Sequence, residues 1–549
     1  MGKKPTNPNI VLPSVLFQRQ KAVSIIVLGI LFAGFTVACG KPEDPAVQRS
    51  LKEENVLRYD VNAPFISLNP VTVKASGSNN IFPLLYSYLF VPDSNGKLRP
   101  DLATKWVFDP GKLQWTIYIR NDALFHNKRA ITSKDVKYSY ENLLKNIRPD
   151  LYSVIDRISL LSDTAFCIHL KKEDPLLLQK IWYFEIVSHP NGEEIDYYHH
   201  PIGSGSFQFK YRKNNKTVVL EANNDFYNGR PVIDKIVFNY QADREKAWTR
   251  LLAGETDIAQ ELSPKNYKML KNYQDRFYFD EYTLRYYTIL LYNTYDPLFS
   301  DPKVRRALSL AIDREYIVEN ILNGYGRVAN GPMGVDSLFH NPKVKPLPFE
   351  PQKAIALLKE AGWSYDKQGR YLYKRGKPFE FTLLVFKEGQ IEKKMACYIQ
   401  LCLNEIGIRL QLKAVAFENL KRSYFRNIEF QAVLTELDGA YRSPEFIKTQ
   451  WSSDINRKAN AGCFAHSEVT QLIQKVIAET DPFKKKEMFY KVDELITSLQ
   501  PGTFLIQKTA IDAMSRRFTL PAPFSLEYEG IYRLRHASLD RSQSLNWNF

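Results

Sequence analysis

Segments with strand periodicity and segments with helix periodicity alternate along this chain from about residue 56 onward. Residues 115–119 (Trp-Thr-Ile-Tyr-Ile) alternate in polarity, as a half-buried strand does, and residues 216–220 follow the same period of two. Such interleaving predicts α/β domains rather than a helical bundle or a β-sandwich. The chain of 549 residues is long enough for several domains, and its content of 44% hydrophobic residues is typical of globular proteins.

Two predicted helices carry explicit start and stop signals. Asp301 stands directly before Pro302, so a capping carboxylate precedes a proline at the first helical position. The apolar residues that follow share one helical face: Val304, Ala307, Leu308, Ala311 and Ile312. A second helix is predicted to begin at Pro351 and to end before Gly362.

The N-terminus has the form of an export signal. Residues 22–38 are uncharged and apolar, follow the basic residues Arg19 and Lys21, and end directly before Cys39. Small residues before a cysteine resemble the lipobox of bacterial lipoproteins, in which the cysteine is acylated. We therefore expect residues 1–38 to be a lipoprotein signal peptide, Cys39 to be the lipid attachment site, and residues 39–53 to be a lipidated tether. The alternative is a signal anchor that is not cleaved; in both cases the rest of the chain is exported.

Charge and cysteine spacing exclude several classes of protein. The net charge is +15, but basic and acidic residues are interleaved, so no basic patch for nucleic acid is predicted. The remaining cysteines have no metal-ligand spacing and are predicted to be buried small apolar residues: Cys167, Cys397, Cys402 and Cys463. We expect no metal and no cofactor.

The chain also lacks the sequence motifs of common enzyme classes. It contains no GxSxG elbow, no HExxH and no GxxxxGK[ST]. His199 and His200 are adjacent, which on a strand would point them to opposite faces, so a shared metal is not expected. The chain is therefore predicted not to be an enzyme and to have no catalytic residue.

Four segments, in order, carry a resemblance to a known family. They are GKLRPDLA at 96–103, PIGSGSF at 201–207, LLAGETDI at 251–258 and DPKVRRALSLAIDR at 301–314. These segments are similar to those of the family 5 extracellular solute-binding proteins, a group that includes oligopeptide-, dipeptide- and nickel-binding proteins. The resemblance assigns the Gly-Ser-Gly-Ser stretch at 203–206 to a turn rather than to a nucleophile.

The resemblance implies an α/β, two-lobe class II periplasmic-binding-protein fold with an extra domain inserted in the first lobe. By analogy, lobe I takes residues 54–79, 203–292 and 515–549, the inserted domain takes 80–202, and lobe II takes 293–514. The hinge would include a crossing at Tyr292, Asn293 and Thr294, with a second crossing near residues 508–516.

The implied function is that of an extracytoplasmic solute-binding protein of an ABC importer. It would capture an oligopeptide in the interlobe cleft and deliver it to the membrane permease. Expected partners are a peptide or other small solute, ABC permease subunits, and a membrane that the chain reaches through its lipid anchor. The chain is expected to be a monomer on the periplasmic side of the bacterial cell envelope. The alternatives are a non-peptide ligand (nickel chelate, heme, opine or oligosaccharide) or a receptor that does not transport.

The resemblance also points to ligand-binding residues. Peptide-binding members have a Trp-x-x-Asp-Tyr-x-x-Pro stretch whose aspartate pairs with the ligand ammonium. Tyr441 and Pro444 match this stretch, but Leu437 and Ala440 replace its tryptophan and aspartate. Asp438 either substitutes for the missing carboxylate or is a turn residue.

Two further candidates lie near the beginning of the folded part. Lys74 and Ser76 fall where the first lobe of the family borders the cleft. Lys74 either meets a ligand carboxylate or is an exposed lysine on a loop.

Overall fold

The protein is described by a computed structural model. It describes residues 55–71, 77–92, 97–174, 177–190, 196, 199–335, 337, 339–416, 419–420, 428–439, 445–453, 460–479, 481–519, 534 and 538–539. The predicted signal peptide, Cys39, the tether, Lys74, Ser76 and Tyr441 lie outside the described residues. Residues Leu57–Phe549 form one compact unit.

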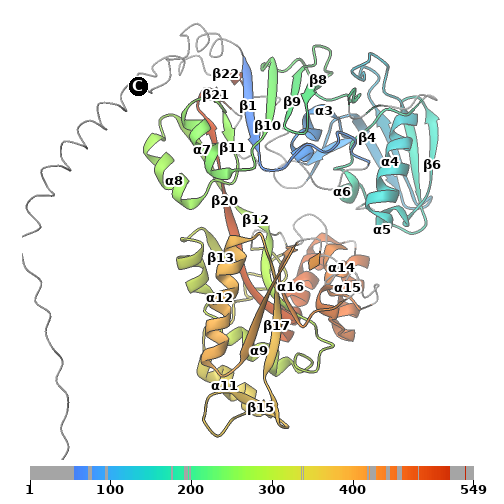
Figure 1. The fold of residues 1–549 in the computed structure, drawn as a ribbon. Helices are drawn as coiled ribbons and strands as arrows, with labels where there is room; N and C mark the ends of the chain where they lie inside the picture. Colours follow the sequence, from blue (N-terminus) through green and yellow to red (C-terminus); the bar gives the residue numbers. More distant parts are fainter. Residues whose placement is uncertain are drawn as a thin grey trace, which may run out of the picture. The chain divides into compact units, whose positions relative to one another are not determined.

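The largest sheet has the strand order β18-β17-β19-β12-β20-β11-β1-β10-β9-β8, and β13 also pairs with β20. Its strands are β1 (Val56–Val61), β8 (Phe207–Lys213), β9 (Thr217–Ala222), β10 (Lys235–Tyr240), β11 (Ile258–Ala259), β12 (Phe277–Tyr292), β13 (Gly326–Val328), β17 (Glu380–Phe386), β18 (Arg409–Val415), β19 (Ala432–Asp438) and β20 (Gly502–Ser515). We call β1 and β8–β11 the first strand group, and β13 and β17–β19 the second strand group. The two long strands β12 and β20 take part in both groups (Figure 1).

A separate four-stranded sheet has the order β4-β5-β7-β6. Its strands are β4 (Ala103–Asp109), β5 (Gln114–Ile119), β6 (Ile155–Ser162) and β7 (Ala165–Leu170). Helix α4 (Ser133–Ile147) packs on this sheet and buries Val136, Tyr140 and Leu143 in a core of its own. The smaller pairings join β2 (Phe90–Pro92) to β3 (Leu98–Pro100), β14 (Ser364–Tyr365) to β15 (Leu372–Lys374) and β16 (Lys377–Pro378), and β21 (Phe518–Thr519) to β22 (Ser538–Leu539).

The remaining helices lie between these strands in sequence, so the chain is a mixed α/β protein, as predicted. They are α3 (Phe82–Leu85), α5 (Pro149–Tyr152), α6 (Leu177–Ile181), α7 (Arg244–Leu252), α8 (Pro264–Leu270), α9 (Pro302–Leu310), α10 (Arg314–Tyr316), α11 (Pro351–Glu360), α12 (Gln390–Glu405), α14 (Glu445–Trp451), α15 (Ser467–Ala478) and α16 (Pro482–Leu499).

Local sequence signals placed several of these elements correctly. Helix α9 begins at Pro302, and the Asp301 carboxylate accepts the Lys303 N–H at 2.9 Å, as the capping prediction requires. Helix α11 begins at Pro351, and Gly362 follows it with a φ of +87°, which favours glycine. The strands predicted at 115–119 and 216–220 are confirmed as β5 and β9.

Separate apolar cores support the two strand groups. In the second group, Leu308 of α9, Leu383 of β17 and Ile399 of α12 are fully buried together. In the first group, Tyr59 and Phe238 lie in another core. Burying a side chain of this size contributes about 1.5–3 kcal/mol, so each group has substantial stability of its own.

One prediction about the cysteines is wrong. Cys397 is exposed, whereas Cys167, Cys402 and Cys463 are buried. Cys397 and Cys402 both lie on α12, and five residues on a helix turn the two side chains to different faces, so only Cys402 reaches the core.

Candidate functional site

Strands β12 and β20 pair with each other over most of their length, but the pairing is interrupted. Their register shifts between Thr283 and Tyr287, so residues 284–286 have no partner on β20 in this ladder. From Tyr286 onward, β12 also pairs with β19 of the second strand group. On the other side of the interruption, Ala513 and Met514 of β20 pair with β11 of the first strand group. The interruption is thus the place where the two strand groups are joined.

The side chain of Gln507 replaces the missing ladder bonds at this interruption. Its Nε2 donates to the Leu284 carbonyl at 3.1 Å, and its Oε1 accepts the Val335 N–H at 2.8 Å. Gln507 is 1% exposed, so these bonds satisfy a buried amide. One side chain therefore links strand β12 to the segment at Val335.

Lys508, the next residue of β20, carries a mostly buried charge. Its ammonium lies 2.7 Å from the Glu392 carboxylate on α12 and 2.9 Å from the Glu436 carboxylate on β19. Burial lowers the pKa of Lys508, but the two carboxylates outweigh burial and hold the pKa above its ordinary value. Lys508 is therefore charged and links β20 to α12 and β19.

Asp438, the last residue of β19, lies at the same interruption. Its side chain is 13% exposed, and a carboxylate oxygen is 3.4 Å from the Arg285 Nε. Arg285 is 39% exposed, and its guanidinium also lies over the Tyr286 ring at 4.6 Å. The structure thus places Asp438 in an ion pair at the crossing, with its carboxylate mostly shielded from water.

Gly439 fixes the backbone beside this ion pair. Its N–H donates to the Arg285 carbonyl at 2.9 Å, and its carbonyl accepts the Gly334 N–H at 3.1 Å. A Cβ at position 439 would lie 2.8 Å from both the Arg285 carbonyl oxygen and the Gly334 nitrogen. Only glycine allows this approach, so the end of β19 is held against the interruption in β12.

On the first-group side of the interruption, Asp512 of β20 is fully buried. Its carboxylate accepts the Glu261 N–H at 2.8 Å and the Tyr282 hydroxyl at 3.2 Å. Burial raises the pKa of Asp512 to about 7. Charged groups of both signs are therefore held at low exposure along the crossing, an arrangement suited to recognising a polar or charged solute by direct pairing.

The residues predicted as a hinge crossing, Tyr292, Asn293 and Thr294, lie at and just after the end of β12. Tyr292 is fully buried at the end of β12, stacks on Phe299 with ring centroids 4.9 Å apart, and shares a hydrogen bond of 2.7 Å with Thr503. The Asn293 N–H donates to the Gln431 carbonyl, and the Thr294 N–H donates to the Gly462 carbonyl. All three residues are held within the second strand group.

The Gly-Ser-Gly-Ser stretch predicted to be a turn is packed against helix α3. A Cβ on Gly203 or Gly205 would approach the α3 backbone to about 2 Å: 1.9 Å from the Leu85 oxygen and 2.1 Å from the Leu84 oxygen, respectively. His126 contacts backbone groups through both ring nitrogens, at 3.2 Å to the Gly203 nitrogen and 3.1 Å to the Gly205 oxygen. Burial lowers the pKa of His126 to about 4, so a neutral, backbone-bound imidazole closes this turn.

Within the described ranges, no helix has the length and apolar character needed to span a bilayer. The same residues hold no cluster of three or more His, Cys, Asp and Glu side chains arranged for a metal ion.

Sequence reasoning missed most of the charged crossing, including Arg285, Glu392, Gln507, Lys508 and Asp512. A signal was present, because Gln507, Lys508 and Asp512 interrupt an otherwise apolar strand. Polar residues that a buried strand retains are paired or functional.

Comparison with known proteins gives a family match. The family model described as "Bacterial extracellular solute-binding proteins, family 5 Middle" matches residues 97–458. The oligopeptide-binding protein AppA of Bacillus subtilis (strain 168) is 28% identical over 512 residues, which cover 89% of this chain and 93% of that protein. The nickel-binding periplasmic protein of Escherichia coli (strain K12) is 26% identical over 363 residues, covering 63% of this chain and 69% of that protein.

Solved structures share the fold. The Bacillus subtilis AppA structure in complex with a nonapeptide has a TM-score of 0.74 at 24% identity, covering 88% of this chain and 99% of that chain. The structure of NikA from Brucella suis in complex with Fe(III)-EDTA has a TM-score of 0.77 at 20% identity, covering 88% of this chain and 100% of that chain. The fold is therefore the two-lobe periplasmic-binding fold, as the resemblance implied.

Proposed function

Because the chain belongs to the family 5 bacterial extracellular solute-binding proteins, we propose that it captures an oligopeptide between its lobes and delivers it to the permease of an ABC importer. The observation that carries the ligand class is the match to the Bacillus subtilis oligopeptide-binding protein, which extends over 89% of this chain and 93% of that relative. A match of this extent includes both lobes, and both lobes would contact a ligand that is held between them. The protein would bind and release its solute without changing it chemically.

The ion pair at the crossing supports recognition of a charged peptide end. Asp438 is mostly buried, whereas Arg285 is partly exposed. A peptide ammonium would take the place of the Arg285 guanidinium beside Asp438, so the carboxylate exchanges one cation for another. An exchange of this kind avoids the cost of leaving a shielded carboxylate unpaired. Lys74, Ser76 and Tyr441 remain further candidates for ligand contacts.

The hinge that we propose replaces the crossing expected at Tyr292–Thr294 and overlaps the second crossing expected near residues 508–516. Residues 284–286 leave the ladder, and Gln507 bridges the gap with its side chain. A hinge needs a few backbone positions that change their dihedral angles without breaking a core. Residues 284–286 and 507–509 flank the interruption and meet this requirement better than Tyr292–Thr294. Tyr292 lies in a core, and the two residues after it are held by backbone hydrogen bonds to Gln431 and Gly462.

We also propose the division into lobe I, the inserted domain and lobe II along the bounds expected from the family. The separate sheet and core of β4–β7 support an inserted domain at 80–202. Ala513 and Met514 of β20 pair with β11 of the first group, which supports a return to lobe I close to residue 515.

The cellular setting is a proposal from the N-terminal sequence. Acylation of Cys39 would attach the mature chain to the extracytoplasmic side of a bacterial membrane through the 39–53 tether. A monomer held by this tether would stay near the membrane and could deliver its solute to the permease.

Mass spectrometry of what co-purifies with the protein tests the ligand class. The full chain is purified in the absence of added solutes and unfolded, and the released small molecules are identified. We expect a set of peptides. A single nickel chelate, heme, opine or sugar in their place would contradict the peptide proposal and favour the alternative within the same family, since relatives include a nickel-binding protein.

A further inference from the structure

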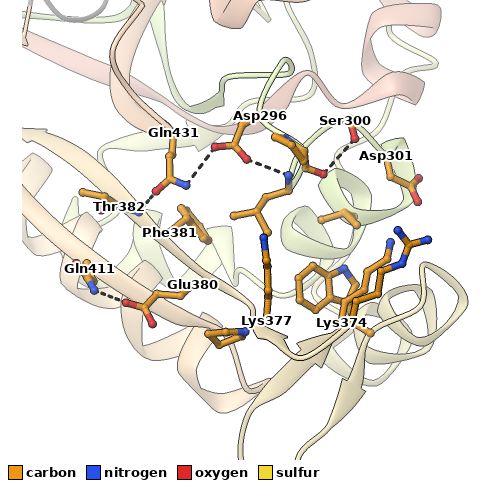
Figure 2. A pocket seen from close by; sticks show the side chains of 16 residues that line it. Asp296, Ser300, Asp301, Lys374, Lys377, Glu380, Phe381, Thr382, Gln411 and Gln431 are labelled. Carbon is orange, nitrogen blue, oxygen red and sulfur yellow. Dashed lines mark hydrogen bonds between the residues drawn. The ribbon is translucent and has the colours of Figure 1, made fainter.

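A pocket of about 810 Å³ lies in the second strand group, away from the crossing. Its walls come from the β15–β16 hairpin, the start of α9 and the beginning of β17, and none of the charged residues of the crossing lines it. Figure 2 shows Lys374 and Lys377 on the hairpin side and Asp296, Thr382 and Gln431 across from them. Pockets of about 300–1,000 Å³ are the size that holds small molecules.

The hairpin brings an unusual set of positive charges to this pocket. Lys374 and Lys377 are paired directly across the two strands, and Arg375 occupies the turn between them. Like charges placed directly opposite on neighbouring strands repel each other. Arg375 has a φ of +51° and Gly376 a φ of +76°, which a tight hairpin turn requires, so the turn itself holds these cations close together.

These three cations are not neutralised by the part of the chain that the structure describes. There, the side chains of Lys374, Arg375 and Lys377 form no ion pair or hydrogen bond; the Lys374 ammonium lies over the Trp363 ring at 5.9 Å. Arg375 and Lys377 are exposed, and Lys374 is half-buried.

The acidic residues around the pocket are occupied by other groups. Asp301 caps α9 through the Lys303 N–H at 2.9 Å. Asp296 accepts the Leu298 N–H at 2.9 Å and the Gln431 side-chain amide at 3.1 Å. Glu380 accepts a hydrogen bond from Gln411 and lies 3.8 Å from the Arg409 guanidinium. Each of these three carboxylates therefore already accepts at least one hydrogen bond, and among the described residues none of them is paired with Lys374, Arg375 or Lys377.

Trp363 adds a buried donor and an aromatic wall. It is 6% exposed, stacks on Phe379 with ring centroids 4.3 Å apart, and lines the pocket. Its Nε1–H is buried and has no hydrogen-bond partner among the described residues. Trp363 therefore offers the pocket its ring as an aromatic wall.

We propose that this pocket is a second binding site, for a small molecule that joins an anionic group to an apolar, ring-sized body. The anionic group would lie among Lys374, Arg375 and Lys377 and relieve their mutual repulsion. The apolar body would lie against Trp363, Phe381 and Val304. This site is separate from peptide capture and does not depend on it.

Fluorine NMR with 4-fluorophenylacetate as the probe tests this proposal on the full chain. The matched neutral probe is 4-fluorophenylacetamide, and inorganic phosphate serves as a competitor with an anionic group but no ring. The variants are Lys377→Gln, on an exposed residue, and the double substitution Lys374→Gln with Lys377→Gln. The matched control is Lys413→Gln, which removes an exposed lysine of β18 outside the pocket.

We expect saturable binding of the carboxylate probe, near the millimolar range that is usual for a ligand with few contacts (Kd about 1 mM). The double variant should bind at least tenfold more weakly, the single variant should lie between, and Lys413→Gln should bind as the unsubstituted protein does. Phosphate should compete only weakly, because it lacks the ring. Equal binding of the neutral probe, equal binding by all variants, or no saturable binding would each overturn the proposal.

Discussion

The carboxylates of Asp438 and Asp512 lie along the same crossing, and their surroundings give them different roles. Asp438 is beside a cation, Arg285, that is partly exposed. Asp512 is fully buried and is bound by neutral donors, so burial raises its pKa to about 7. The first is suited to exchange partners with a ligand, and the second is suited to respond to pH.

Asp438→Asn should weaken binding of a peptide with a free amino terminus by about a hundredfold, at about 1.4 kcal/mol for each factor of ten. The amide cannot balance a ligand ammonium in a shielded site. Calorimetry should also show that N-acetylation of the peptide weakens binding to the unsubstituted protein and has little effect on the variant. Asp163→Asn, at an exposed position, is the matched control and should bind normally. Equal affinity for both peptides in both proteins would show that Asp438 does not pair with the ligand.

Asp512→Asn should flatten the dependence of stability on pH. The folded-state pKa of about 7 lies above the ordinary value of 3.8, so the folded state binds more protons between these pH values. The contribution of Asp512 is therefore present below about pH 4 and is lost as pH rises through about 7. Between about pH 5 and about pH 8, the free energy of unfolding should fall by about 1–4 kcal/mol more in the unsubstituted protein than in the variant.

Urea unfolding of both proteins at the two pH values measures this difference. Asp493 and Glu185 also have their pKa values raised to about 7 by burial, but both proteins contain them, so their contributions cancel. The same change of stability with pH in both proteins would contradict the burial of an ionisable Asp512.

Strand β20 is held to its neighbours by Lys508 as well as by backbone pairing. Lys508→Gln removes the cation between Glu392 and Glu436 and leaves the two carboxylates facing each other. We expect the free energy of unfolding to fall by about 1–3 kcal/mol. This lies between the usual cost of breaking an exposed salt bridge and that of breaking a buried one. Lys413→Gln should change stability little, because Lys413 is an exposed residue of the edge strand β18. Chemical denaturation measures the stability of both variants. Equal stability of the two would show that the ion pairs of Lys508 contribute nothing.

The elements that the sequence predicted well are those determined by neighbouring residues. Helix α9 follows from Asp301 and Pro302 alone, and β5 follows from its alternating residues. The interruption that we propose as the hinge could not be located in this way, because it becomes visible only when Leu284 meets Gln507, 223 residues later. The exposed position of Cys397 was missed because cysteine composition does not indicate which face of α12 is buried.

The candidate site was predictable only in part for the same reason. The family motif drew attention to Asp438, and the structure places it at the crossing with Arg285. The partners of Lys508 come from α12 and β19, two elements that are distant from β20 in sequence. Lys74, Ser76 and Tyr441 remain predictions.

Considered as a whole molecule, the protein should depend on Cys39 for its attachment to membranes. Cys39→Ala removes the thiol that would be acylated, and each buried CH₂ of the acyl chains contributes about 0.8 kcal/mol to anchoring. The variant should appear in the soluble fraction or accumulate as uncleaved precursor. Cys397→Ala, which removes an exposed cysteine of α12, should remain attached to membranes. A mature protein that keeps residues 1–38 and carries no lipid would contradict the anchor.

The central claim is that a solute is captured between two lobes that close through a hinge at residues 284–286 and 507–509. A ligand can shift the balance between open and closed forms only if it binds the closed form better. Small-angle X-ray scattering of the protein, with and without a peptide shown by calorimetry to be saturating, measures this change directly. We expect a smaller radius of gyration with the peptide bound. An unchanged radius at saturation would contradict capture by closure of the lobes.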